Sequence, residues 1–324
     1  GYADLNFLIP EVIRSVGYQK GPYFADEGDF SAAGAVRIGY VDTLPRDLVS
    51  ISAGTLGDYR AFVGMSRPQG VGNLLLGLSY EHVDGPWRIP DNFNKGNMVV
   101  RYSQGDDTDG FSVTGMYMRN GFHATNQVPL RAVQSGALGL YDAVDATDGG
   151  NAERFSLSGR LSRDLGWGQL NAGAYAIGSS LSLTSNFDYN LDFDPPVGDQ
   201  FIQRDRRGVY GGDISIAVPH ELFGFAAKTT VGLQTRTDDI HLGLARSTGG
   251  SIWAIVRNDH VVESSAGLFV ENRVRCTDWF RTVAGLRGDV FYGSDTSTTS
   301  QNSGSLSRGV LSPKFSAIFG PWAN

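Results

Sequence analysis

One stretch of the sequence alternates between polar and apolar side chains: Arg154-Phe155-Ser156-Leu157-Ser158-Gly159-Arg160-Leu161-Ser162-Arg163. Successive side chains of a β-strand point to opposite faces, so Phe155, Leu157 and Leu161 fall on one face and the arginines and serines on the other. Charges repeated on one face would be costly in a dry core, but they are normal on a strand that lines a water-filled or plugged lumen. The stretch therefore predicts a strand in the wall of a transmembrane antiparallel β-barrel, and a soluble antiparallel sheet with one solvated face is the alternative.

The same alternation recurs along the chain. In residues 225–236 and 280–292, apolar side chains face one way and basic side chains the other. Residues 48–324 offer about twelve strand candidates, an even number that a membrane barrel permits, and the first covers residues 48–56. After a tight turn at 57–58, the predicted connections alternate between short (68–72, 105–110, 164–168, 219–224, 276–279) and long (84–96, 121–152, 185–207, 237–260, 294–306). This alternation places every long connection on one side, as in outer-membrane barrels.

The composition of the 324-residue chain is compatible with this fold. The chain is 41% hydrophobic and 19% charged, and no apolar run approaches the roughly 20 residues that a transmembrane helix needs. Its 43 glycines and 11% aromatic residues suit many strands with tight turns and interfacial rings. The net charge of -7 offers no basic face for nucleic acid. Cys276 is the only cysteine, so no intrachain disulfide can form.

The start of the chain, Gly1-Tyr2-Ala3-Asp4, has neither the basic residues nor the apolar segment of a secretory signal. An outer-membrane protein must be exported, so we expect the sequence to be a mature chain or an internal fragment. A complete small barrel of about twelve strands is the alternative.

Residues 12–38 have a different pattern from the rest. A short apolar strand at 12–18 ends at Lys20-Gly21-Pro22, crosses a loop that contains Gly28, and returns through a small-residue strand at 33–38 that contains Gly34. This unit resembles the last part of the plug domain of TonB-dependent outer-membrane receptors. Residues 125–133 also resemble a segment of one subgroup of these receptors. Glycine permits positive φ and close approach of the plug to the wall, and proline stiffens the turn.

The resemblance implies an all-β fold in the bacterial outer membrane. Residues 1–47 would be the C-terminal part of the plug and its linker, and residues 48–324 would be the N-terminal part of the barrel. The family's barrel has about 22 strands, of which about twelve would be present here. The alternation of connections agrees, because counting residues 33–40 as a wall strand would make the first wall strand run in the wrong direction.

The resemblance also implies a function and partners. Such receptors take up a scarce solute actively, most often a ferric siderophore or a similar metal chelate, and TonB with its inner-membrane energising complex displaces the plug. Outer-membrane lipid and lipopolysaccharide would surround the barrel. A passive porin or structural barrel is the alternative, and its lumen would favour anions because it is lined by Arg154, Arg160, Lys228, Arg281 and Arg287. A simple porin would lack the plug tail.

The sequence shows no catalytic constellation, and we do not expect an enzyme. The five histidines are scattered without metal-ligand spacing, and no nucleophile elbow is present. A soluble β-rich enzyme or carbohydrate-binding module is a distant alternative that detergent-free extraction would reveal. The long loop at 121–152 can cover a barrel mouth, and the candidate solute contacts are Tyr2, His123, Arg131 and Tyr141.

One acidic loop resembles a calcium loop in part. Asp188, Asn190 and Asp192 place oxygen ligands at alternate positions, and Asp194 and Asp199 follow. Phe193 stands where the sharp turn needs glycine, and Asp199 replaces the bidentate glutamate. We therefore expect a solvated acidic loop, with calcium as the secondary hypothesis and no other cofactor.

Overall fold

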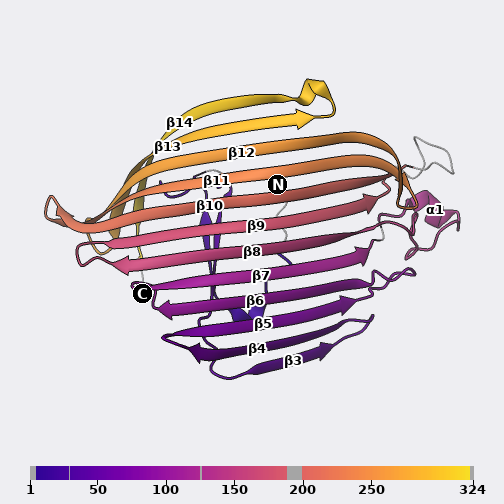
Figure 1. Ribbon diagram of the computed structural model, residues 1–324, viewed down its shortest axis with the longest axis horizontal. Helices are drawn as coiled ribbons and strands as arrows, with labels where there is room; N and C mark the ends of the chain where they lie inside the picture. Colours follow the sequence, from indigo (N-terminus) through magenta and orange to yellow (C-terminus); the bar gives the residue numbers. More distant parts are fainter. Residues whose placement is uncertain (1–4, 29, 125, 188–198, 322–324) are drawn as a thin grey trace.

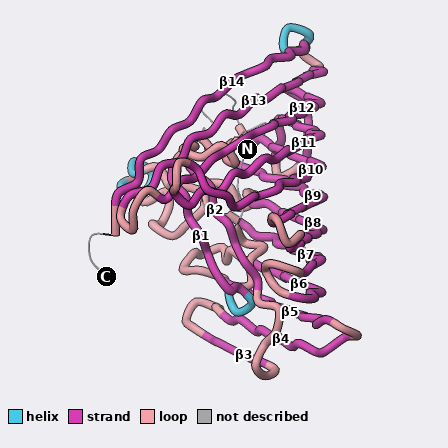
Figure 2. Tube along the Cα trace, turned by 90° about the vertical axis from the view of Figure 1, so that its left-hand side faces the viewer, coloured by secondary structure: helices cyan, strands magenta, loops and turns pink. Residues whose placement is uncertain are grey.

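The computed structural model describes residues 5–28, 30–124, 126–187 and 199–321. A long antiparallel sheet forms a curved wall, and a two-stranded sheet lies on its concave side (Figures 1 and 2). Across these ranges, no helix has both the length and the apolar character needed to span a membrane. The arrangement agrees with the predicted all-β fold.

Within the described residues the wall contains twelve strands, and each pairs with its neighbours in the sequence. Strands β3 and β14 stand at the two ends of this order, so the described wall is an open curved sheet. The wall strands are β3 (Leu48–Ala53), β4 (Tyr59–Gln69), β5 (Gly72–Val83), β6 (Phe93–Gly105), β7 (Gly110–His123), β8 (Gly149–Asp164), β9 (Gln169–Ser185), β10 (Gln200–Leu222), β11 (Phe225–Thr248), β12 (Ser251–Arg275), β13 (Phe280–Ser297) and β14 (Gly304–Phe319).

The remaining elements are short. On the concave side, η1 (Pro10–Val12) leads into β1 (Ile13–Lys20), which pairs with β2 (Gly34–Tyr40). Figure 2 shows β1 and β2 crossing the space that the curved wall partly encloses. Helix α1 (Leu130–Gln134) lies in the connection between β7 and β8, and η2 (Ser300–Asn302) lies between β13 and β14.

The number of strands was predicted correctly, but the prediction of a long loop at residues 237–260 was wrong. Strands β11 and β12 continue through it to a tight turn at Gly249 and Gly250, which have φ of 56° and 78°. This hairpin is visible among the longest in Figure 1. Beyond the apolar band Asp238 and Asp239 are polar on both faces, and the next apolar residues, Ile240, Leu242 and Leu244, fall on the concave face instead of the convex one. The strand therefore lost the alternation that identified it. For the same reason the loops at 185–207 and 294–306 are shorter than predicted, since β10 begins at Gln200 and β14 at Gly304.

The two faces of the wall are chemically distinct, as the alternation predicted. Phe155 and Leu157 are 54% and 47% exposed on the convex face. On β13, Val290 is 61% exposed, whereas Arg287 and Asp289 are 4% and 8% exposed on the concave side. The apolar residues thus face the expected lipid and the charged residues face the inner sheet.

Candidate functional site in the inner segment and the outer loops

The inner segment, residues 5–47 without 29, is held to the wall in two ways. The first is an apolar anchor, in which Ile9 and Val12 pack on Phe62, Leu75 and Val99. All five side chains are at most 1% exposed. Each of these wall residues comes from a different strand, β4, β5 or β6, so the contact ties η1 to one side of the wall.

A charge pair lies beside the apolar anchor. The Arg60 guanidinium donates two hydrogen bonds to the Glu11 carboxylate, at 2.6 and 2.9 Å. These bonds stabilise the ionised acid and hold the pKa of Glu11 below its usual value, against the opposing effect of burial. Glu11 thus neutralises the positive charge of Arg60, which points from the wall strand β4 to the concave side.

The second attachment is a polar anchor, in which the backbone of residues 24–27 is held by side chains of β11 to β14. The Ala25 amide donates to Glu271 Oε2 at 2.8 Å, and the Ala25 carbonyl accepts from Arg287 Nη1 at 3.2 Å. Lys314 Nζ donates to the carbonyls of Phe24 and Glu27 at 2.7 and 2.6 Å. Backbone groups are thus the main partners, and the contact depends little on the side chains of the inner segment.

Arg287 is the centre of the polar anchor. Its guanidinium also donates to Gln234 Oε1 at 2.8 Å and pairs with Asp289 at 2.8 Å. A Cβ on Gly28 would lie 2.3 Å from Arg287 Nη2. The predicted role of Gly28 in a close approach to the wall has this physical basis.

The other residues of the predicted plug turn serve backbone geometry. Lys20 pairs with Gly34 at the end of the β1–β2 ladder. Gly21 has φ of 65° and Gly34 has φ of 146°, values that favour glycine. Pro22 lies in the connection directly after Gly21.

Aromatic residues of the inner segment lie against wall arginines. The guanidinium of Arg154 is 4.6 Å from the ring centre of Phe7, and Arg273 is 5.2 Å from that of Phe24. Arg273 also donates to Glu271 at 2.6 Å. Arg154 and Arg273 are thus engaged by the inner segment, and Arg273 also by a nearby carboxylate.

At the side of the wall that carries α1, two connections pack together. The rings of Trp87 and Tyr141 lie 6.1 Å apart, and the Arg88 amide donates to the Tyr141 carbonyl at 3.0 Å. Trp87 Nε1 donates to Asp91 Oδ2 at 3.0 Å, and the His123 amide donates to the Asp91 carbonyl at 2.7 Å. Burial raises the pKa of Asp91, although the Trp87 hydrogen bond opposes the shift.

A second junction in these loops is built on Asp148, which is 2% exposed. Its carboxylate accepts from the Asn186 amide at 3.0 Å, from Gln200 Nε2 at 3.2 Å and from Asn126. Burial raises the pKa of Asp148, and these hydrogen bonds counteract the shift in part. Gln200 Oε1 in turn accepts from Ser247 Oγ at 2.9 Å, which connects the junction to β11.

The sequence did not identify this junction as a unit. Asp145-x-Thr147 is a local turn signal, and Asp145 Oδ1 accepts from the Thr147 amide at 2.9 Å. The partner Gln200, which is 1% exposed, lies too far along the chain for any local pattern to reveal it.

The structure separates the predicted solute contacts. His123 and Tyr141 lie at the two ends of the contacts made by Asp91 and Trp87. Arg131 is exposed on α1, and within the described ranges no hydrogen bond or ion pair joins its side chain to either of them. Tyr2 lies outside the described residues.

Most of the predicted calcium loop also lies outside the described residues, namely Asp188, Asn190, Asp192 and Asp194. Its last member, Asp199, is fully buried. The calcium hypothesis therefore remains a prediction.

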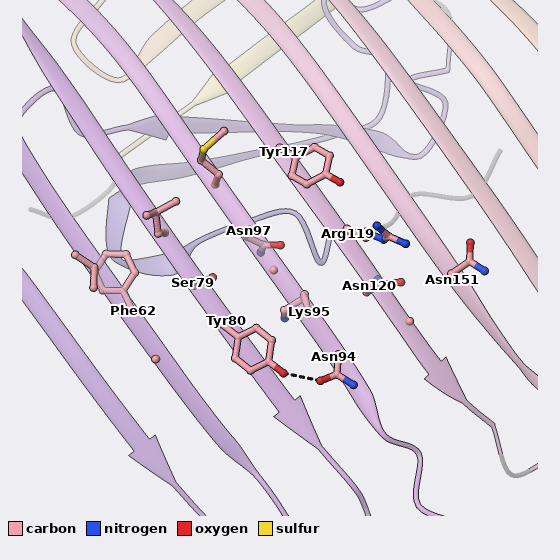
Figure 3. Close-up of a pocket in the computed structure, with 16 residues that line it drawn as sticks. Phe62, Ser79, Tyr80, Asn94, Lys95, Asn97, Tyr117, Arg119, Asn120 and Asn151 are labelled. Atoms are coloured by element: carbon pink, nitrogen blue, oxygen red, sulfur yellow. Dashed lines mark hydrogen bonds between the residues drawn. The ribbon is translucent and has the colours of Figure 1, made fainter.

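A hollow of about 810 Å³ lies on the convex face of the wall (Figure 3). The side chains of Tyr80, Asn94, Tyr117 and Arg119 border it. Gly96 has no side chain to fill the space, and a Cβ there would meet no atom within 4 Å. The Tyr117 hydroxyl donates to Glu153 Oε1 at 2.7 Å. Because these side chains face away from the inner segment, the hollow is a feature of the membrane-side surface and not of a path through the wall.

The model of the TonB dependent receptor-like beta-barrel family matches residues 79–324. No curated protein matches the chain in sequence.

Solved structures show the same fold at low sequence identity. The unliganded ferric citrate transporter FecA is similar with a TM-score of 0.74 and 10% identity, over 94% of this chain and 47% of that one. The siderophore receptor PiuA from Acinetobacter baumannii gives 0.72 and 13%, over 96% and 52%. The pyoverdine outer membrane receptor FpvA from Pseudomonas aeruginosa PAO1, bound to pyoverdine, gives 0.70 and 14%, over 95% and 49%. The chain spans about half the length of these relatives.

Proposed function

The chain belongs to the TonB-dependent receptor family of the bacterial outer membrane, and we propose that it is part of a receptor for TonB-driven uptake of a scarce solute. The observation that carries this proposal is the inner segment, which lies within the curve of the wall and is attached by the apolar and polar anchors. A wide polar barrel would leak if it were empty. A folded element inside it therefore implies a gate that must be displaced by work.

We assign residues 1–47 to the C-terminal part of the plug and its linker, and residues 48–324 to the N-terminal part of the barrel. The separate two-stranded sheet and the twelve-stranded wall support this division. TonB and its inner-membrane energising complex are the proposed source of work, and outer-membrane lipid and lipopolysaccharide are the proposed surroundings of the convex face.

The proposed solute is a ferric siderophore or a similar metal chelate. The titles of the similar structures name a ferric citrate transporter, a siderophore receptor and a receptor bound to pyoverdine. His123, Arg131 and Tyr141 are the proposed contacts from the outer loops, since they combine an imidazole, a cation and an aromatic ring on the side of the wall that carries α1.

A passive porin is the less favoured function. Arg287 is 4% exposed and is bonded to Asp289 and to the Ala25 carbonyl. Arg154 lies over the Phe7 ring. These two residues of the expected anion-attracting lining are therefore occupied by the inner segment or by a carboxylate, whereas Arg160, Lys228 and Arg281 are exposed.

The proposal is tested by uptake of labelled ferric siderophores in cells that carry the full-length receptor, with and without TonB. Uptake should saturate with solute and fall to background when TonB is removed. Uptake that is unchanged by loss of TonB would establish passive diffusion and overturn the proposal. A panel of siderophores, vitamins and oligosaccharides in the same assay identifies the solute.

The outer-loop contacts are tested by Tyr141→Ala, which should weaken solute binding by about tenfold, because loss of one good aromatic contact costs about 1.4 kcal/mol. Tyr210→Ala is the matched control, since Tyr210 is 56% exposed on the convex face. Equal binding by the two variants would remove Tyr141 from the solute site.

A further inference from the structure

Three side chains with metal-binding atoms meet on the hairpin of β11 and β12. His241 and His260 are paired in register on the two strands, and their rings are stacked with centres 4.2 Å apart and planes at 6°. Asp239 Oδ1 lies 2.8 Å from His260 Nε2 and 3.7 Å from His241 Nε2. Both imidazoles thus direct a ring nitrogen at one carboxylate oxygen.

The cluster lies on the convex face. Asp239 and His241 alternate in phase with Val231 and Leu233, which are 48% and 43% exposed on that face. It therefore belongs neither to the apolar or polar anchor nor to the proposed solute contacts.

The cluster also lies beyond the apolar band of the wall. Tyr210, Thr237, Ser264 and Tyr292 are paired in register on the neighbouring strands β10 to β13. The exposed side chains of Tyr210 and Tyr292 therefore lie at the same level of the sheet. His241 is four residues further along β11, about 13 Å towards the turn. Tyrosines of this kind lie at the membrane interface, so the cluster is open to water.

We propose that Asp239, His241 and His260 form a binding site for a divalent transition-metal ion such as Zn²⁺, Ni²⁺ or Cu²⁺. Two imidazoles and one carboxylate suit these ions, whereas Ca²⁺ and Mg²⁺ require oxygen ligands. The three ligand atoms lie within 4.8 Å of one another. Bonds of about 2.0 Å in a tetrahedral site need ligands about 3.3 Å apart. The His241, Asp239 and His260 side chains are 60%, 50% and 45% exposed, so rotation can close this gap.

A bound ion would cross-link β11 to β12 outside the membrane. Three protein ligands leave a fourth position for water or an external ligand. The site does not depend on TonB-driven transport, so either proposal can fail without the other.

The charges around the cluster decide how tightly it binds. Arg206 on β10 pairs in register with His241 and is exposed on the same face. Arg206, Asp239 and His241 line a hollow of about 550 Å³ together with Glu153 of β8. On the other side, His260 pairs with Thr296 of β13, which carries no charge. Arg206 is therefore the cation in register with the cluster that opposes a bound metal ion, and Arg204, which pairs with Gly243, is a second exposed cation on the same face.

The test uses the full-length receptor in detergent, without a polyhistidine tag and washed with chelator. Co²⁺ is the spectroscopic probe, and Zn²⁺ competes for the site. Wild-type protein should bind one Co²⁺ that gives the visible bands of a four-coordinate ion and is displaced by Zn²⁺. His241→Ala and His260→Ala should each weaken binding at least about tenfold, because each removes a ligand.

Two further variants separate a metal site from a hydrogen-bonded histidine pair. Arg206→Gln should tighten Co²⁺ binding several-fold by removing a nearby positive charge. His220→Ala should leave binding unchanged, because His220 bonds Thr229 Oγ1 at 2.8 Å at the opposite end of the hairpin. The proposal is overturned if the folded double variant of His241 and His260 binds Co²⁺ as tightly as the wild type.

Discussion

The two anchors of the inner segment are held by different kinds of interaction. At the apolar anchor, Ile9 and Val12 are buried against Phe62 and Leu75, where stability comes from area removed from water. At the polar anchor, the backbone at Ala25 is held by hydrogen bonds and charges. Water can replace hydrogen bonds of this kind, so each contributes only about 0.5–3 kcal/mol net. The difference suggests that residues 24–28 can leave the wall while the region around η1 stays attached.

This contrast also fits the proposed transport cycle. A gate must keep a wide barrel closed and still open under limited work. Polar contacts to backbone groups let water take over each bond as it breaks, whereas exposing the apolar anchor would cost its full burial. We therefore expect displacement to begin at the polar anchor.

The largest expected effect is at the apolar anchor. Phe62→Ala should lower the free energy of unfolding of the full-length receptor by about 4 kcal/mol, because the ring is 1% exposed and its removal leaves a cavity. Urea unfolding of the receptor refolded into lipid vesicles measures this loss. Val63→Ala is the control, since Val63 is 37% exposed on the convex face and should cost less. Equal losses in the two variants would contradict the apolar anchor.

A smaller effect is expected at the polar anchor. Gly28→Ala places a Cβ 2.3 Å from Arg287 Nη2. The guanidinium is 4% exposed and is held by Gln234 and Asp289, so moving it breaks those bonds and should cost about 1–3 kcal/mol. Gly288→Ala is the matched control, because its Cβ would meet only Leu311 Cδ1 at 3.8 Å.

The measurement for Gly28→Ala is the rate at which protease cleaves residues 24–28 in the folded full-length receptor, together with ion conductance in planar bilayers. Both should rise relative to Gly288→Ala. If cleavage instead rises near η1 and the polar anchor stays protected, the order of release proposed above is wrong.

The wall could be predicted from the sequence because its signal is local. Phe155 and Arg154 reveal opposite faces within two neighbouring residues, and the twelve strands follow from repeats of that pattern. The long β11–β12 hairpin was missed because Asp239 and His241 are polar on the face where apolar residues had marked the strand. The glycine pair at 249–250 was the remaining turn signal.

The anchors and the loop junction were beyond sequence reasoning for a different reason. Ala25 and Glu271, or Asp148 and Gln200, meet only because the wall is curved and the loops fold over it. No periodicity links residues so distant in the chain. The positions of Lys20, Gly21 and Gly34 were easier, since their demands on the backbone are local.

The smallest expected effect concerns the charge pair beside the apolar anchor. Glu11→Gln should cost about 1 kcal/mol at neutral pH, because it removes the charge from two hydrogen bonds with Arg60 in a partly exposed position. The folded-state pKa of Glu11 is lowered, so its stabilising contribution is present above the usual glutamate pKa of about 4.3. That contribution is lost as the pH falls through the lowered value.

The stability difference between wild type and Glu11→Gln should therefore be constant from pH 7 to about pH 5 and vanish in stronger acid. Urea unfolding at each pH measures it. Asp148 has a raised pKa, so its contribution has the opposite sign: it is full below the usual aspartate pKa and is lost as the pH rises through the raised value. Hydrogen exchange should thus show acid loosening η1 while the Asp148 junction tightens. Exchange at η1 that stays unchanged or slows in acid would show that the Glu11 pair adds nothing to the apolar anchor.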